Sequence, residues 1–279
     1  MTTKPHYLRL EDFYRDGHIF ITGATGFLGK LLLNTLLRKF SDIDTLYILV
    51  RERGGVTIEK RIDSLFESVE PNLGISSSDY SLLISKVNII FHCAATLRFD
   101  EELRFAIRTN LGSTQSALNL ARKCLQLKCF TYVSTAFSNA YRQQIDEVIY
   151  PPKTHYKQLI SLSKIESNED PQYVTARKCL SQENVNTYTL TKAASEQLIQ
   201  EEAGKIPVAI FRPSIVISTN NEPIPGWIDN LYGPTGVITG FKSGIIRSFH
   251  VNAKNKADLV PADWTVNALI CSAWHSANR

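Results

Sequence analysis

The sequence lacks several features that mark other classes of protein. Its five cysteines form no Cys-x-x-Cys pair, so we expect a reducing compartment, no disulfide and no metal site. No apolar run is long enough to cross a bilayer, and residues 1–15 are too polar for a secretory signal. The formal net charge of +4 over 279 residues suits an anionic ligand but does not predict nucleic-acid binding.

A strand, a glycine turn and a helix are indicated near the start of the chain. Residues 18–22 are an apolar run typical of a buried strand, and residues 30–37 have the pattern of an amphipathic helix. Between them lies Gly-x-x-Gly-x-x-Gly. Such glycines permit a tight turn, let amides approach a pyrophosphate and let the helix pack closely, so a dinucleotide site is favoured over a plain turn. The residues predicted to bind it are Thr22, Gly23, Thr25, Gly26, Phe27, Leu28 and Gly29.

Further strands and helices alternate along the chain. The pattern predicts strands over residues 45–51, 87–92, 129–133 and 207–213, and helices over 56–69, 77–86, 101–121, 186–202 and 266–273. We therefore expect an α/β fold, a Rossmann-like doubly wound parallel sheet within one domain over 1–279. A small loop-rich substrate cap is expected from roughly 139–170 and 218–260. Two helices follow each other around Val69 and Glu70 with no strand between them, so one sheet strand is missing there.

Two strand ends bear on the cofactor. The end of the second strand lies beside the adenosine ribose in this fold. An acidic residue there binds a 2′-hydroxyl, whereas an arginine suits a 2′-phosphate. Arg51 therefore favours NADPH over NADH, with a solvated strand end as the alternative. The small Ala94, after the strand over 87–92, leaves room for a cofactor.

The candidate catalytic residues are a tyrosine and a lysine one helical turn apart. Tyr188 and Lys192 share one helix face. A tyrosine pKa is about 10, and a nearby ammonium favours the phenolate, so Tyr188 can act as general acid toward an oxygen that gains negative charge. Lys192 would also hold the nicotinamide ribose. Ser134 and Thr135, at a strand end, could donate hydrogen bonds to the same oxygen. Alone, Tyr-x-x-x-Lys also occurs by chance on helices.

Other residues carry weaker signals. His92 is better explained as a strand-end side chain than as a base. Asn110 could relay a proton through water to Lys192, or it could be a helix-surface amide. Pro213 could position the carboxamide end of the cofactor, or it could end a strand. No cysteine has a basic partner at a spacing that indicates an acyl-accepting nucleophile.

Several segments together resemble one family, the alcohol-forming fatty acyl-CoA reductases of the male-sterility type, an extended branch of the short-chain dehydrogenases/reductases. The matching segments are TGATGFLGK (22–30), LVR (49–51), FHCAATLRFD (91–100), VSTAF (133–137), YTLTK (188–192), FRPS (211–214), EPIPGW (222–227) and ADLVP (257–261). The resemblance implies that two NADPH reduce a long-chain acyl-CoA, through a bound aldehyde, to a fatty alcohol and free CoA. It also implies an intracellular role in wax or ether-lipid synthesis, at a peroxisomal or endoplasmic-reticulum membrane surface.

The chain departs from the family in two places. Family members have a strand between Val69 and Glu70 that forms a wall of the adenine site, and they continue into a C-terminal domain with membrane-associating segments. We therefore expect a shortened form that binds NADPH weakly, that is soluble or makes only peripheral membrane contact, and that could pair with a full-length reductase without being catalytic. A sugar-nucleotide epimerase or dehydratase of the extended branch is the other alternative.

Overall fold

Five parallel strands form the central sheet in the described part of this computed structural model, which covers residues 8–50, 71–152, 154–182, 186–252 and 254–279. The sheet order is β2-β1-β3-β4-β5. The strands are β1 (His18–Thr22), β2 (Thr45–Leu49), β3 (Ile89–His92), β4 (Cys129–Val133) and β5 (Val208–Phe211). Because the order reverses after β1, the sheet is doubly wound, and the predicted Rossmann-like α/β fold is confirmed.

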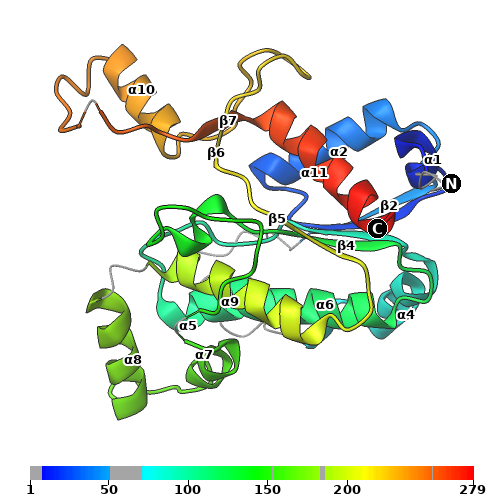
Figure 1. The fold of residues 1–279 in the computed structure, drawn as a ribbon, viewed down its shortest axis with the longest axis horizontal. Coiled ribbons are helices and arrows are strands. Elements are labelled where there is room, and N and C mark those ends of the chain that lie inside the picture. The colour runs from blue at the N-terminus through cyan, green and yellow to red at the C-terminus, as the bar shows by residue number, and fades with distance from the viewer. Residues whose placement is uncertain (1–7, 51–70, 153, 183–185, 253) are drawn as a thin grey trace, which may run out of the picture.

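Helices cover both faces of the sheet (Figure 1). Side chains alternate across the strands, so Ile19, Ile21 and Phe91 pack toward one face and Phe20 and Ile90 toward the other. The first face carries α1 (Leu10–Tyr14), α2 (Phe27–Lys39) and α11 (Ala262–Ala277). The second carries α4 (Ser77–Lys86), α6 (Ser113–Lys123) and α9 (Thr187–Glu202). Burial on both faces explains the continuous apolar runs of β1, β3 and β4.

The outer strand on one side is β2 in the part of the chain that the structure describes. Its residues are half-buried, and Ile48 is 45% exposed. The largely apolar run over residues 45–51 predicts a strand buried on both faces, and the half-burial of β2 shows that this prediction is wrong. The next described element is the turn η1 (Pro71–Gly74). The helix predicted over 56–69, the strand predicted as missing at Val69 and Glu70, and Arg51 all lie outside the described residues.

The helix predicted over 101–121 is interrupted. The segment consists of α5 (Leu103–Ala106), a π-helical turn η2 (Ile107–Gly112) and α6. A π turn widens the helix by one residue and is frequent at functional sites. Here it carries Asn110, whose side chain is 1% exposed. The interpretation of Asn110 as a helix-surface amide is therefore wrong.

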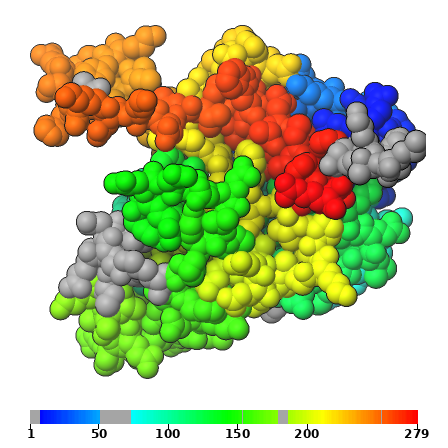
Figure 2. Space-filling view, in the orientation of Figure 1, coloured from blue at the N-terminus to red at the C-terminus, as the bar shows by residue number. Residues whose placement is uncertain are grey.

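Each of the two predicted cap segments contains a helix in addition to its loops. Between β4 and α9 lie η3 (Ala136–Asn139), α7 (Tyr156–Leu162) and α8 (Pro171–Gln182). The segment 218–260 follows β6 (Ile215–Ile217), contains α10 (Pro234–Lys242) and enters β7 (Leu259–Pro261), which pairs with β6. Its α10 region projects from the body of the molecule (Figures 1 and 2).

The connection from β1 to α2 packs backbone against backbone. Gly23 has φ +73°, and a Cβ there would lie 2.7 Å from the Ala94 nitrogen at the end of β3. A Cβ on Gly29, in the first turn of α2, would lie 2.8 Å from the Ala24 Cα and would collide with the Gly23 carbonyl oxygen. Neither position can hold a side chain unless the turn moves, so these glycines fix how α2 meets the sheet.

We expect Gly29→Ala to destabilise the fold by about 2–3 kcal/mol, because overpacking against backbone cannot be relieved by a rotamer change. Thermal unfolding of the purified chain measures this, and the expected fall in Tm is about 5 °C or more. The control is Asn34→Ala, on the exposed side of the same helix. Equal Tm values for Gly29→Ala and the parent chain would show that the turn is not closely packed.

Candidate active site

The N-terminus of α2 presents unoccupied backbone donors. Gly26 is the N-cap residue, and no side chain caps the helix. The first turn holds no acidic residue, and Thr25 and Gly26 are exposed while Phe27 and Leu28 are half-buried. The amides of a helix N-terminus and its positive dipole end bind anions. The predicted pyrophosphate site therefore has suitable donors where the glycine turn leaves them accessible.

The second cap segment meets the same helix end. Lys30 Nζ lies 2.8 Å from Asp229 Oδ2, and the rings of Phe27 and Trp227 stack with centroids 5.5 Å apart. The residues that precede Trp227 are held by α11, because the Asp263 carboxylate accepts the amides of Asn220, Asn221 and Glu222 at 2.8–3.2 Å. The segment 218–229 is thus fixed beside the N-terminus of α2.

The Thr22 side chain supports the site from behind. Its hydroxyl lies 2.7 Å from His92 Nδ1, and His92 Nε2 lies 3.2 Å from the Thr114 hydroxyl. Thr22 is fully buried, so it supports the glycine turn rather than facing a ligand. Burial, and secondarily the charge of Lys192, lowers the pKa of His92 to about 3. His92 is therefore a neutral strand-end residue, as the sequence indicated.

Asn110 joins two parts of the site. Its Oδ1 accepts the Thr96 amide at 2.8 Å, and its Nδ2 donates to the Thr96 carbonyl at 3.2 Å and to the Thr191 hydroxyl at 2.9 Å. Thr96 follows Ala94 in the loop after β3, and Thr191 is on α9. The π turn thus clamps the loop beside the glycine turn to the helix of Tyr188 and Lys192.

Tyr188, Thr135 and Lys192 lie together at the carboxyl end of β4. The side chains of Tyr188 and Thr135 interact, and Lys192 Nζ lies 5.9 Å from the centre of the Tyr188 ring. Lys192 is 3% exposed, and its ammonium donates to the Val133 carbonyl at 2.6 Å. The structure therefore brings together a proton donor, a hydroxyl and a cation that are far apart in sequence.

The pKa of Tyr188 differs from the sequence expectation. Burial raises it, and the interaction with the Thr135 hydroxyl opposes that rise. The expected lowering by Lys192 is wrong here, because the ammonium is directed to the Val133 carbonyl. A raised pKa keeps the phenol protonated at neutral pH, which suits a proton donor.

Ser134 does not share the predicted role of Thr135. Its side chain is 2% exposed, and its hydroxyl donates to Glu196 Oε1. Glu196 also pairs with Arg212 at 2.6 Å. Neither Glu196 nor Arg212 was predicted from the sequence to belong to the site. Glu196 nevertheless follows Lys192 by one helical turn and so lies on the same face of α9. Pro213 lies next to this pair, and its carbonyl accepts the Ala136 amide at 2.9 Å.

The thiol nearest the site is not a nucleophile at neutral pH. Cys93 immediately follows β3, and burial raises its pKa to about 12. Cys124, at the end of α6, has a pKa raised by burial to about 11. Both groups stay protonated, and a thiol is a much weaker nucleophile than a thiolate.

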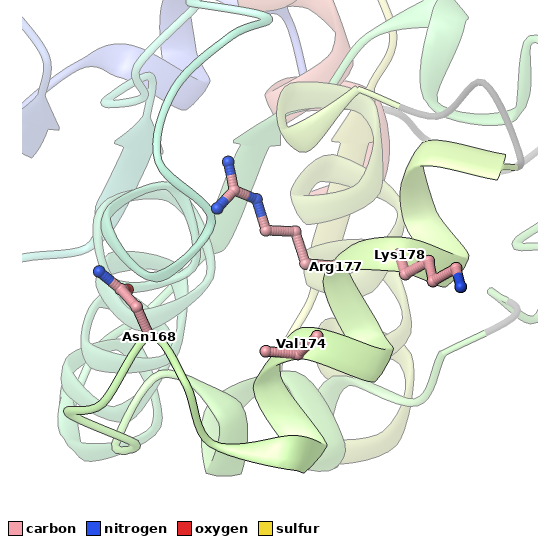
Figure 3. Close-up of a pocket in the computed structure, with 4 residues that line it drawn as sticks. All are labelled: Asn168, Val174, Arg177 and Lys178. Atoms are coloured by element: carbon pink, nitrogen blue, oxygen red, sulfur yellow. The ribbon is translucent and has the colours of Figure 1, made fainter.

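A separate hollow of about 320 Å³ lies beside α8 (Figure 3). Asn168, Val174, Arg177 and Lys178 line it, and the Lys178 side chain points away from Asn168. None of these residues belongs to the group around Tyr188. The hollow is therefore a surface feature of α8 and the residues just before it.

Comparisons with known proteins agree with the motifs. The family model described as "Male sterility protein", an NAD-binding domain, matches residues 21–70 and 67–269. Fatty acyl-CoA reductase 1 of Xenopus laevis is 38% identical over 293 residues, which cover 96% of this chain and 56% of that protein. Fatty acyl-CoA reductase 2 of Bos taurus is 40% identical over 289 residues, with 95% and 56% covered. The chain thus spans little more than half the length of these relatives.

Solved structures with the same fold include reductase domains. The terminal R domain from the myxalamid PKS-NRPS pathway has a TM-score of 0.62 at 23% identity, covering 90% of this chain and 61% of that one. The R domain of a non-ribosomal peptide synthetase from Mycobacterium tuberculosis has a TM-score of 0.61 at 22% identity, covering 94% and 64%. At these identities the likeness concerns the fold alone. On the family match, its relatives and the motifs together, this chain is a member of the male sterility protein family of fatty acyl-CoA reductases.

Proposed function

We propose that this chain reduces a long-chain acyl-CoA to a primary fatty alcohol through a bound aldehyde, with NADPH as reductant. The observation that carries the proposal is the group of Tyr188, Thr135 and Lys192 at the end of β4. The open N-terminus of α2 supports a dinucleotide in the same site. The named relatives are fatty acyl-CoA reductases, which supports the substrate class.

Separate groups of residues would hold the two ends of the cofactor. The amides that follow Gly26 suit the pyrophosphate, and Ala94 leaves space beside them. Asn110, Lys192 and Pro213 surround the end of β4, where the nicotinamide half would bind. Arg51 follows β2 and would pair with a 2′-phosphate. When bound, the cofactor supplies hydride to the substrate carbonyl.

The protein residues handle the charge that hydride transfer creates. The substrate oxygen gains negative charge, and Tyr188 gives it a proton. The Thr135 oxygen accepts the Phe137 amide at 3.2 Å. Its hydroxyl proton is therefore available to Tyr188 and, once substrate is bound, to the substrate oxygen. The first reduction gives a hemithioacetal, which releases CoA as its thiol and leaves the aldehyde. The second reduction repeats the proton transfer and gives the alcohol, so no acyl-cysteine is needed.

We also propose that residues 230–257 make peripheral contact with an anionic lipid surface. The α10 helix has no buried residue, and large apolar side chains of this segment are exposed: Leu231, Tyr232, Ile238, Phe241, Ile245, Phe249 and Val251. The segment contains four Lys or Arg residues and no Asp or Glu. Apolar side chains with surrounding cations bind anionic bilayer surfaces. No helix in the described residues is long and apolar enough to cross a membrane.

We expect the purified chain to bind NADPH, measured by nucleotide fluorescence, and to bind NADH at least about tenfold more weakly. Gly26→Val should abolish binding, because its side chain would fill the space in front of the α2 amides. Arg51→Glu should remove the preference for NADPH. If the chain is folded but binds neither nucleotide, it is a non-catalytic derivative of a reductase rather than an enzyme.

Tyr188→Phe should lower kcat/KM for acyl-CoA reduction by about 10²–10⁴-fold, because the proton donor is lost while the ring remains. Release of free CoA in the presence of NADPH is the measurement, and it also separates this activity from that of a sugar-nucleotide enzyme. The matched control is Tyr141→Phe, since Tyr141 is 59% exposed and lies outside the site. Equal activity of both variants would contradict the role of Tyr188.

Sedimentation with lipid vesicles tests the membrane contact. The chain should bind phosphatidylcholine vesicles that contain phosphatidylserine, and salt should weaken the binding. Ile245→Asp should abolish it, whereas Ile224→Asp, at another exposed isoleucine outside the segment, should not. Binding that is absent in the parent chain, or equal in both variants, would contradict the proposal.

A further inference from the structure

A charged pair lies buried behind the candidate catalytic residues. The Glu196 side chain is 1% exposed and the Arg212 side chain 14% exposed. Arg212 Nε donates to Glu196 Oε1 at 2.9 Å and Nη2 to Oε2 at 2.6 Å. This bidentate geometry is the strong form of an ion pair. A buried pair is nevertheless weak evidence for stability, because desolvation offsets much of the attraction. Its position therefore invites a functional explanation.

The Glu196 carboxylate accepts hydrogen bonds from two serine hydroxyls near the end of β4. Oε1 accepts the Ser134 hydroxyl and the Ser138 hydroxyl at 3.3 Å. Ser134 precedes Thr135, and Ser138 lies in the short helix that follows it. Thr135, which contacts Tyr188, therefore lies between two serines that are both hydrogen-bonded to Glu196.

Arg212 extends the connection to the first cap segment. Its Nη1 donates to the Asp146 carbonyl at 3.2 Å and its Nη2 to the Val148 carbonyl at 2.8 Å. The one ion pair therefore joins the ends of β4 and β5, helix α9 and the segment 146–148. Pro213, predicted to position the cofactor, is the next residue after Arg212.

The same carboxylate lies one helical turn beyond Lys192. We propose that Glu196, held by Arg212, is the positioning residue that keeps Lys192 charged and keeps Thr135 in place beside Tyr188. This inference rests on the proposed function, because it assigns a role within that site. It adds two residues that the Tyr-x-x-x-Lys pattern does not contain.

The surroundings of Lys192 explain why a counter-charge matters. Its ammonium faces the Val133 carbonyl at 2.6 Å, the Tyr132 ring at 4.7 Å and the Tyr188 ring at 5.9 Å. Cys93 and His92, on the neighbouring strand, interact with its charge. All four side chains are neutral at pH 7: burial raises the pKa of Tyr132, Tyr188 and Cys93 and lowers that of His92. Among the described residues that act on Lys192, Glu196 alone supplies a negative charge at neutral pH.

The balance of these effects brings the pKa of Lys192 close to neutral pH. Burial lowers its pKa to about 8, and Cys93 and then Glu196 oppose that fall. A lysine is charged below its pKa. Removing the negative charge of Glu196 should therefore lower the pH at which Lys192 loses its proton. An uncharged Lys192 would hold the nicotinamide ribose less well.

Nuclear magnetic resonance of the whole chain, labelled with ¹³Cε-lysine, tests this without cofactor or substrate. One lysine signal, absent in Lys192→Met, should titrate near pH 8, well below ordinary lysines near about 10.4. In Glu196→Gln we expect that midpoint to fall by about one pH unit or more. In Glu201→Gln, on the same helix but paired with His155 at the surface, it should not move. An unchanged midpoint in Glu196→Gln overturns the proposal.

Two further variants separate charge from packing. Ser134→Ala removes one hydrogen bond of Glu196 but keeps the ion pair, so the Lys192 midpoint should stay near that of the parent chain. If Glu196→Gln does not fold, Glu196→Gln combined with Arg212→Met removes both charges, and the midpoint should still fall. A midpoint that moves with Ser134→Ala as far as with Glu196→Gln would overturn the charge argument.

Activity then distinguishes the two proposals. If the chain reduces acyl-CoA, the pH above which kcat/KM declines should shift downward in Glu196→Gln by the same amount as the Lys192 midpoint. If the midpoint shifts but no variant, nor the parent chain, reduces acyl-CoA, the proposed function fails while the link between Glu196 and Lys192 stands. A parent chain that is active, with the midpoint unmoved, refutes this inference alone.

Discussion

The contact between the glycine turn and the end of β3 is the constraint on which the site depends. Gly23 meets the backbone of Cys93 and Ala94 so closely that no side chain fits between them. This contact directs the start of α2 across the carboxyl ends of the strands. It also places the loop after β3 where Asn110 can clamp it to α9. A cofactor cradle and a catalytic helix thereby become neighbours.

Behind that contact, buried polar groups divide the site into two layers. Tyr188 and Thr135 form the layer that can meet a substrate. Behind them, Thr22 pairs with His92, and Ser134 and Arg212 both pair with Glu196. Such groups are costly to bury unless every donor and acceptor finds a partner. The supporting layer therefore has one arrangement, and that arrangement sets the geometry of the reacting layer.

The curated relatives are longer than this chain, in which the α10 segment is exposed. The curated reductases share the region matched here and extend well beyond it, since this chain covers 56% of their length. The strand order and the motifs of the site all fall within the shared region. The projecting segment with α10 differs from the rest of the molecule, because it buries none of its helix. Apart from the contact between the Phe241 and Phe249 rings, its large apolar side chains are exposed.

Features that depend on local pattern could be predicted from the residues alone. The glycine spacing indicated the turn, the apolar runs indicated the strands, and the four-residue interval placed Tyr188 and Lys192 on one helix face. The remaining features arise only in the folded chain. The tertiary structure widened a helix into a π turn and buried Asn110, turned the Ser134 hydroxyl toward Glu196, and raised the pKa of Tyr188 where a fall was expected. The physical reason is that periodicity reports which residues share a face, whereas protonation and hydrogen bonding depend on buried partners that the fold brings from distant parts of the chain.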